Sequence, residues 1–138
     1  MAKESGLGLT VTVDDSGGTG RAISNDITNL TFGMPSGIQD ITGVNSSGME
    51  RLLLIADLVV SLNGVFNDLA TTGAFNIFKD YRTLAASQVG RTTAIAHSGN
   101  TLSDEILYSD FAHTRAADGS LTWNAPGSLS DGGVPAWA

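Results

Sequence analysis

Hydrophobic and polar residues alternate along several short segments of this chain. Near the amino terminus, Leu9, Val11 and Val13 alternate with polar neighbours. This period of two is typical of a β-strand with one buried face. Further strand regions are predicted at 21–32, 38–42 and 89–97, with glycine-rich or proline-containing breaks at 16–20 and 34–37.

The clearest amphipathic segment runs from residue 56 to residue 67. Its even-numbered positions are mostly apolar and its odd-numbered positions mostly polar. One face therefore belongs to a core, and the other faces water or a neighbouring molecule. The even positions include Ala56, Leu58, Val60, Leu62 and Phe66, and the odd positions are Asp57, Val59, Ser61, Asn63, Val65 and Asn67.

The period changes after Thr72. Apolar residues from Ala74 to Ala85 recur at intervals of three and four, which predicts a helix over 73–86 with one buried stripe. Thr72 is suited to cap its start. Lys79 and Arg82 lie toward its end, where the helix dipole favours cations.

A long hairpin is predicted near the carboxyl end. The strand-like run 102–115 is followed by Asp118-Gly119, a pair typical of a type I′ turn, and the chain returns through 121–123. Beyond residue 127 no periodicity remains, yet Val134 and Trp137 are apolar. We expect these two residues to anchor the tail on a partner surface, with docking on the chain's own body as the alternative.

Together these elements predict an all-β protein, a β-sandwich or partly closed barrel with one flanking α-helix and long hairpins. At 138 residues the chain fits one domain with a core of its own. We expect residues 1–138 to form that domain. An amino-terminal arm at 1–8 and a carboxyl-terminal tail at 128–138 are expected to extend to neighbouring copies.

Charged side chains are scarce in this sequence. They make up 15% of the residues, against about 25% in ordinary soluble domains. A surface with few charges and many β-prone residues favours association. We therefore expect copies of the chain to cover much of one another's surface.

The net charge of −7 argues against a conventional DNA-binding surface. Such a surface needs clustered Lys and Arg to displace counterions from phosphates, and the sequence has no basic run. An acidic chain suits a wall that lets DNA pass instead of holding it, although acidic surfaces also serve solubility alone.

Several sequence features limit the chemistry that the chain can carry out and its expected location. The chain has no cysteine, which excludes disulfides, thiolate metal sites and cysteine nucleophiles. The first five residues contain no apolar segment of a signal peptide, and the longest apolar run, 52–56, is far too short to cross a membrane. We expect no membrane association.

Catalysis has little support in the sequence. A Ser/His/Asp set would have to come from Ser98, Asp110 and either His97 or His113, and the Gly-x-Ser-x-Gly pattern of a nucleophile elbow is missing. Surface or interface positions are the simpler expectation for both histidines, and their spacing does not match a zinc site. We expect no enzyme activity and no cofactor.

Two other motifs have simple structural explanations. Asp14-Asp15 before a glycine-rich turn could bind calcium weakly, but the spacing of a calcium loop is missing, which favours a solvated loop. The run 17–20 lacks the lysine of a phosphate-binding loop. Trp123 alternates with Leu121 and Ala125, which favours core packing.

The order of segments between Leu7 and Trp137 resembles the tail tube (major tail) proteins of long-tailed bacteriophages, chiefly those that infect actinobacteria. In that family an Asp-hydrophobic-Thr-Gly strand end precedes a Glu-Arg segment, a long strand closing near Phe-Asn, and a late hairpin. The matching segments here are Asp40 to Gly43, Glu50-Arg51, Asp57 to Asn67, and Ala117 to Thr122. The helix region 73–86 departs from the family, because it is longer and more aromatic.

The resemblance implies a structural virion protein, made in the host cytoplasm and assembled into the tail. In the family, six copies form a ring whose inner strands join into a β-barrel, and stacked rings form a channel for genome ejection. The implied partners are further copies of the chain, the tape measure protein, the tail-tip initiator and the tail terminator. Double-stranded DNA would pass through the lumen without sequence-specific binding.

The resemblance and the strand phasing together give candidate functional residues. We expect Asp57, Ser61 and Asn63 to line the lumen, with Asp40 as a weaker candidate. Asp57 could instead pair with Arg51 or Arg91 at a seam between subunits. The residues expected in contacts between subunits or rings are Leu7, Leu9, Val134 and Trp137.

Two other classes of function remain open at this stage. The chain could be a different virion component, such as a tail terminator, a neck protein or a capsid decoration protein. A β-sandwich carbohydrate-binding module is a more distant alternative, since two Trp and two Tyr offer little material for an aromatic platform.

Overall fold

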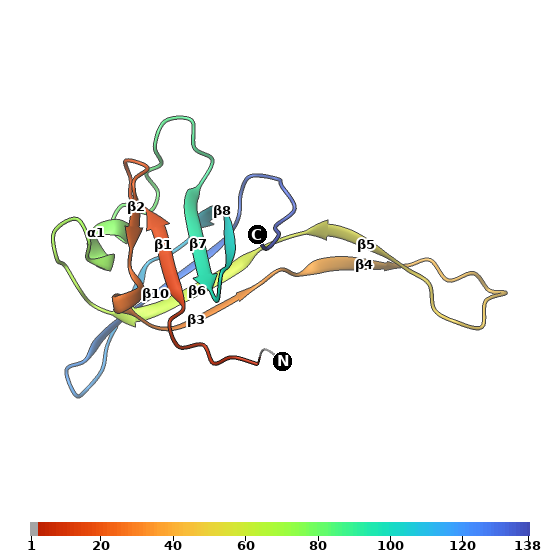
Figure 1. The fold of residues 1–138 in the computed structure, drawn as a ribbon, viewed down its shortest axis with the longest axis horizontal. Helices are drawn as coiled ribbons and strands as arrows, with labels where there is room; N and C mark the ends of the chain where they lie inside the picture. Colours follow the sequence, from red (N-terminus) through yellow and green to blue (C-terminus); the bar gives the residue numbers. More distant parts are fainter. Residues whose placement is uncertain (1–2) are drawn as a thin grey trace.

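The computed structural model describes residues 3–138, and most of its regular structure is β-sheet (Figure 1). The main sheet is antiparallel and has eight strands, in the order β2-β1-β7-β8-β10-β6-β3 with β9 as a further partner of β10. Strands β4 and β5 form a separate two-stranded ribbon. The strands are β1 (Thr10–Asp14), β2 (Gly20–Ala22), β3 (Ile27–Gly33), β4 (Ser36–Asp40), β5 (Arg51–Ala56), β6 (Val59–Val65), β7 (Arg91–His97), β8 (Asn100–Tyr108), β9 (Ala112–Arg115) and β10 (Leu121–Leu129).

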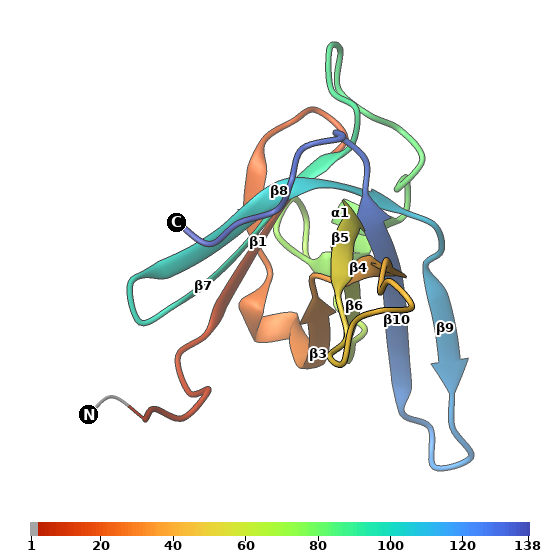
Figure 2. The same cartoon turned by 90° about the vertical axis from the view of Figure 1, so that its right-hand side faces the viewer.

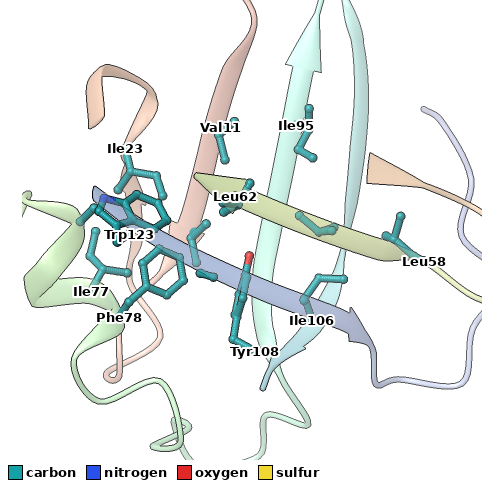
Figure 3. Close-up of a cluster of buried hydrophobic side chains, with 14 of the residues drawn as sticks. Val11, Ile23, Leu58, Leu62, Ile77, Phe78, Ile95, Ile106, Tyr108 and Trp123 are labelled. Atoms are coloured by element: carbon teal, nitrogen blue, oxygen red, sulfur yellow. The ribbon is translucent and has the colours of Figure 1, made fainter. Parts of the chain in front are cut away.

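The main sheet bends so that its two halves face each other across one core. Figure 3 shows Val11 of β1 and Ile95 of β7 on one side of this core, with Leu62 of β6 and Trp123 of β10 on the other. All four side chains are almost fully buried. The predicted all-β, partly closed fold with one flanking helix is therefore confirmed.

Trp123 restricts which residue can occupy the strand beneath its ring. Its indole Nε1 donates a hydrogen bond to the carbonyl oxygen of Val65 at 2.8 Å, and its ring lies over Gly64. A Cβ atom at position 64 would lie 2.7 Å from that ring and 1.9 Å from the carbonyl oxygen of Asp26. The strand can therefore accept only glycine here, which explains a residue that otherwise weakens a strand.

The predicted strand 21–32 is wrong as a single element. Strand β2 ends at Ala22, and a short 3-10 helix, η1 (Ser24–Asp26), carries the chain to β3 on the other edge of the sheet. Ile23 and Ser24 then bind the backbone of Val11 at 3.1 Å and 2.8 Å. These bonds extend the pairing of β1 and close part of the gap between the sheet ends.

The helix is much shorter than the predicted 73–86, because α1 covers only Ala74–Phe78. Thr72 does not cap it. The buried carboxylate of Asp26 instead accepts the backbone N–H of Ala74 and the side-chain amide of Asn67, each at 2.9 Å. No helix among residues 3–138 is long and apolar enough to cross a bilayer.

The helix ends early because Arg91 binds the carbonyl groups that follow. Arg91 is fully buried in the first position of β7, and its guanidinium donates to the carbonyl oxygens of Ile77, Asp80 and Thr83. It also donates to the Asp80 carboxylate at 3.2 Å. A continuing helix would use these carbonyls internally, so the chain turns after Phe78 and packs against the open end of the sheet.

The β4–β5 ribbon projects far from the rest of the molecule, and we name residues 36–56 the arm (Figure 1). The predicted strand 38–42 overlaps β4, but the sequence patterns missed β5 and the ribbon that the two strands form. The predicted break at 34–37 already contains the start of β4, and the predicted strand 56–67 is divided at Asp57, between β5 and β6. Strand β6 also ends at Val65, two residues earlier than expected.

The late hairpin is confirmed, but its turn type is wrong. Gly119 has φ +94°, whereas Asp118 does not have positive φ. The N–H of Ala116 pairs with the carbonyl of Ser120, which leaves a three-residue loop closed by a glycine. Hydrogen bonds from Ser120 hold the pKa of Asp118 below its ordinary value. Strand β10 then continues to Leu129, so the predicted tail at 128–138 begins later than expected.

We predict that Arg91→Met lowers the free energy of unfolding by about 3 to 5 kcal/mol, because the carbonyl groups of Ile77, Asp80 and Thr83 lose their buried donor. Urea denaturation of the purified protein measures this change. Arg82→Met is the matched control, since Arg82 is exposed and only lies over the Tyr81 ring at 5.4 Å. Equal stability of the two variants would contradict the role assigned to Arg91.

Candidate assembly surfaces

The arm exposes large apolar side chains on both of its faces. Ile38 lies opposite Leu53 in the register of the two strands, and Ile55 follows where that register shifts by one residue. These three are 62%, 74% and 89% exposed. Leu52 and Leu54 lie on the opposite face and are also exposed. An isolated two-stranded ribbon is marginally stable in water, so the arm is a candidate contact surface.

Asp40 belongs to the outer part of the arm. Its carboxylate accepts the N–H of Thr42 at 2.9 Å, and it lies opposite Arg51. Hydrogen bonds from Thr42 hold the pKa of Asp40 below its ordinary value. Thr42 also exchanges hydrogen bonds with the backbone of Glu50, so this cluster fixes the two strands where the tip loop begins. Asp40 is not brought together with Ser61 and Asn63.

Asp57 lies where the arm joins the body. Its backbone N–H donates to the carbonyl of Pro35 at 2.9 Å, and its half-buried carboxylate accepts the N–H of Leu58 at 2.8 Å. It precedes β6 and lies opposite Pro35, one step beyond Val59 in the odd-numbered series that carries Ser61. Since Arg91 is fully buried beside Asp80, the suggested pairing of Asp57 with Arg91 across a seam is wrong.

Ser61 and Asn63 do share one surface, on the outward side of β6. Asn63 lies between Asn29 of β3 and Asn124 of β10 in the strand register, which makes a row of three asparagines across three strands. The amide of Asn124 donates to Asn63 Oδ1 at 2.8 Å and to Ser61 Oγ at 3.0 Å. Sequence analysis missed Asn29 and Asn124, because only the strand register brings them beside Asn63.

The four residues predicted at contacts between copies fall into two groups. Leu7 and Val134 are 85% and 79% exposed. Leu9 packs partly against the core. Trp137 bridges to Leu102 on β8 and packs edge-on against Phe32 at 5.9 Å, with 44% of its surface exposed. The tail thus docks partly on the chain's own body, the alternative left open by the sequence.

The candidate Ser/His/Asp set is not formed, because Asp110 contacts neither histidine. His97 lies 3.9 Å from Glu4 at the rim of an open cavity of about 510 Å³, which Ser98 and Trp137 also line. His113 belongs instead to an aromatic cluster on β9, 4.4 Å from the Phe111 ring. Asp110 bonds the N–H of Phe111 and neither histidine.

The acids considered for calcium have partners within the chain. Asp14 is buried and accepts the side-chain amide of Gln88 at 3.0 Å. Asp15 accepts the N–H of Thr19 and pairs with Arg21, and these bonds, the one from Thr19 foremost, lower its pKa. Within residues 3–138, no group of three or more His, Asp or Glu side chains is arranged to hold a metal ion.

Comparison with known proteins gives similarity at the level of structure. No protein-family model matches the chain, and no curated protein sequence matches it. A chain in the virion of a native gene transfer agent particle superposes with a TM-score of 0.72 at 14% identity, covering 99% of both chains. A chain in the tail of an empty gene transfer agent particle, refined helically with C6 symmetry, gives 0.70 at 15% identity, covering 99% of this chain and 98% of that one. These similarities show that the fold is shared over essentially the full length.

We predict that Trp137→Ala lowers the free energy of unfolding of the unassembled chain by about 1 kcal/mol, because it removes an aromatic contact from the body. Val134→Ala is the matched control in the same segment and should leave the unassembled chain unchanged within about 0.5 kcal/mol. Chemical denaturation at low protein concentration measures both. No loss of stability in Trp137→Ala would mean that the tail contributes nothing to its own body.

Proposed function

We propose that this chain is a structural protein of a phage-type tail, whose copies assemble into stacked rings that form a tube for DNA delivery. The observation that carries this proposal is the arm. A body with a complete core bears an extension whose apolar side chains find no cover within residues 3–138. The shared fold with chains of a gene transfer agent virion and tail supports the same function.

Other copies of the chain are the best candidates to cover the two faces of the arm. Because Leu53 and Leu54 project from opposite faces, one flat partner surface covers only half of the arm. We propose that each arm inserts between two neighbouring copies.

The main sheet offers edges that further copies can extend. Strand β3 ends the sheet on one side, and β9 pairs only with β10. Pairing such edges between copies in a ring removes exposed backbone donors and acceptors. The C6 symmetry of the similar tail supports six copies per ring. Ser61 and Asn63 remain our candidates for the lumen, while Asp40 and Asp57 lie on the arm and at its base.

The proposed setting is a virion tail, with synthesis in a host cell. Its partners would be the tape measure protein inside the tube, the initiator at the tail tip, the terminator at the other end, and DNA in transit. The role is structural and needs no catalytic site. A tail terminator or a neck protein is distinguished by assembly, because those proteins stop at one ring, whereas a tube protein polymerises.

We predict that the double variant Leu53→Ser, Ile55→Ser folds normally but no longer forms rings or tubes. Both side chains project into solvent from the unassembled chain, so their loss removes contacts between copies and leaves the core intact. Negative-stain electron microscopy and size-exclusion chromatography of concentrated protein measure assembly, and urea denaturation measures the fold.

Val89→Ser is the matched control, because Val89 is 53% exposed on a loop of the body and lies outside the arm. This variant should assemble as the parent chain does. Tubes formed by the arm variant would overturn the role of the arm. A parent chain that stays monomeric at high concentration, even with an initiator complex present, would contradict the tube proposal itself.

A further inference from the structure

Within strands β9, β10, β6 and β3 the outward face carries no charged side chain, and Asp57 borders it beyond Val59. Residues that lie directly opposite each other in antiparallel strands project from the same side of the sheet, so the register defines the rows of this face. We name it the neutral face. Its rows are Thr114, Thr122 and Val65; Ala112, Asn124, Asn63 and Asn29; Pro126, Ser61 and Thr31; and Ser128, Val59 and Gly33.

This neutrality contrasts with the rest of the chain, which carries fourteen acids and seven bases. Charges occur on the arm, at the β1–β2 turn and on β8. On β8, burial and the neighbouring acids Asp131 and Glu105 raise the pKa of Asp104. The His113 and Arg115 side chains of β9 project from the opposite side of their strand, since they pair with Trp123 and Leu121.

Two side chains of the neutral face donate hydrogen bonds within the sheet. The Asn124 amide donates in the plane of the sheet to Ser61 and Asn63, the neighbours on β6. Thr122 donates in the same way to the carbonyl oxygen of Thr114 at 3.5 Å. The surface is made of short side chains, and the Asn124 amide at its centre is already engaged within the sheet.

From these observations we infer that the neutral face lines the tube and that double-stranded DNA passes along a wall of uncharged amides and hydroxyls. This inference rests on the proposed function and replaces the acidic wall expected from the net charge. In a sixfold ring, one lysine per copy would present about six cations to passing DNA. These cations would bind the phosphates, because binding releases the counterions of the DNA. One carboxylate per copy would add into a repulsive field. A neutral hydrated wall avoids both effects.

The neutral face is less suited to contacts between copies than the arm is. Extensive contacts between subunits need large apolar side chains, and those are concentrated on the arm. On the neutral face the central rows contain amides and hydroxyls, and its exposed valines, Val59 and Val65, lie in the end rows.

The orientation of the face can be tested first, because the chain contains no cysteine. Ser61→Cys is labelled with a maleimide gold cluster, and the assembled tubes are imaged. Gold should lie on the tube axis. Ser103→Cys is the matched control, since Ser103 is exposed on β8 opposite Ala94 of β7, in the other half of the bent sheet, and its gold should lie on the outside. Gold on the outer surface in Ser61→Cys tubes would overturn the inference.

The neutrality is tested with charge variants in assembled tubes. Ser61→Lys and the exposed edge variant Asn29→Lys should both assemble and then retain short double-stranded DNA. Nuclease protection of a fluorescent duplex measures this retention. It should weaken by about a thousandfold between 50 and 200 mM salt if about six lysines of a ring engage phosphates. Parent tubes and Ser61→Asp tubes should retain none.

Each other outcome has a distinct meaning. DNA retention by parent tubes, or none by either lysine variant, would overturn the neutral wall while leaving tube assembly intact. Lysine variants that fold but fail to assemble, while Ser61→Cys assembles, would make the face a seam and overturn the inference as well. A parent chain that forms no tubes contradicts the proposed function first, and the inference with it.

Discussion

The buried guanidinium of Arg91 is the interaction on which the body depends. The bent sheet leaves an open end, and the segment from α1 to Thr83 must cover it although its backbone is only briefly helical. Arg91 supplies the donors that this irregular segment needs, and Asp26 supplies the acceptor for the N–H group at the start of α1. One cation and one anion thus hold the helix between them, and the aromatic side chains of α1 complete the core.

The core of the body is complete without the arm. The body buries Trp123, Phe78 and Ile106 without help from the arm, so substitutions in the arm leave the core unchanged. The arm can then carry Leu53 and Ile55 in positions that a self-contained domain would fill with polar residues. Low overall charge, which in an ordinary domain invites aggregation, is compatible with a chain that carries a dense group of exposed apolar side chains on one extension.

The sequence predicts those parts of the fold in which one local pattern decides the outcome. Alternation identified the strand around Val11 and Val13 and the buried side of β6, because each has one core-facing side. The helix was overestimated, since Arg91, distant along the chain, takes the carbonyls that a longer helix would use. The arm was missed because an apolar run exposed on both faces has no period. The row of asparagines was missed for another reason, as only the register of three strands creates it.

The position of the arm at one end of the molecule gives the chain a direction (Figures 1 and 2). A contact between the arm of one copy and the body of the next joins two unlike surfaces, and unless two copies exchange arms it leaves one arm and one body free for further copies. An assembly built in this way is polar. One end presents unoccupied arms and the other presents unoccupied bodies, so two different proteins are needed to begin such a structure and to stop it.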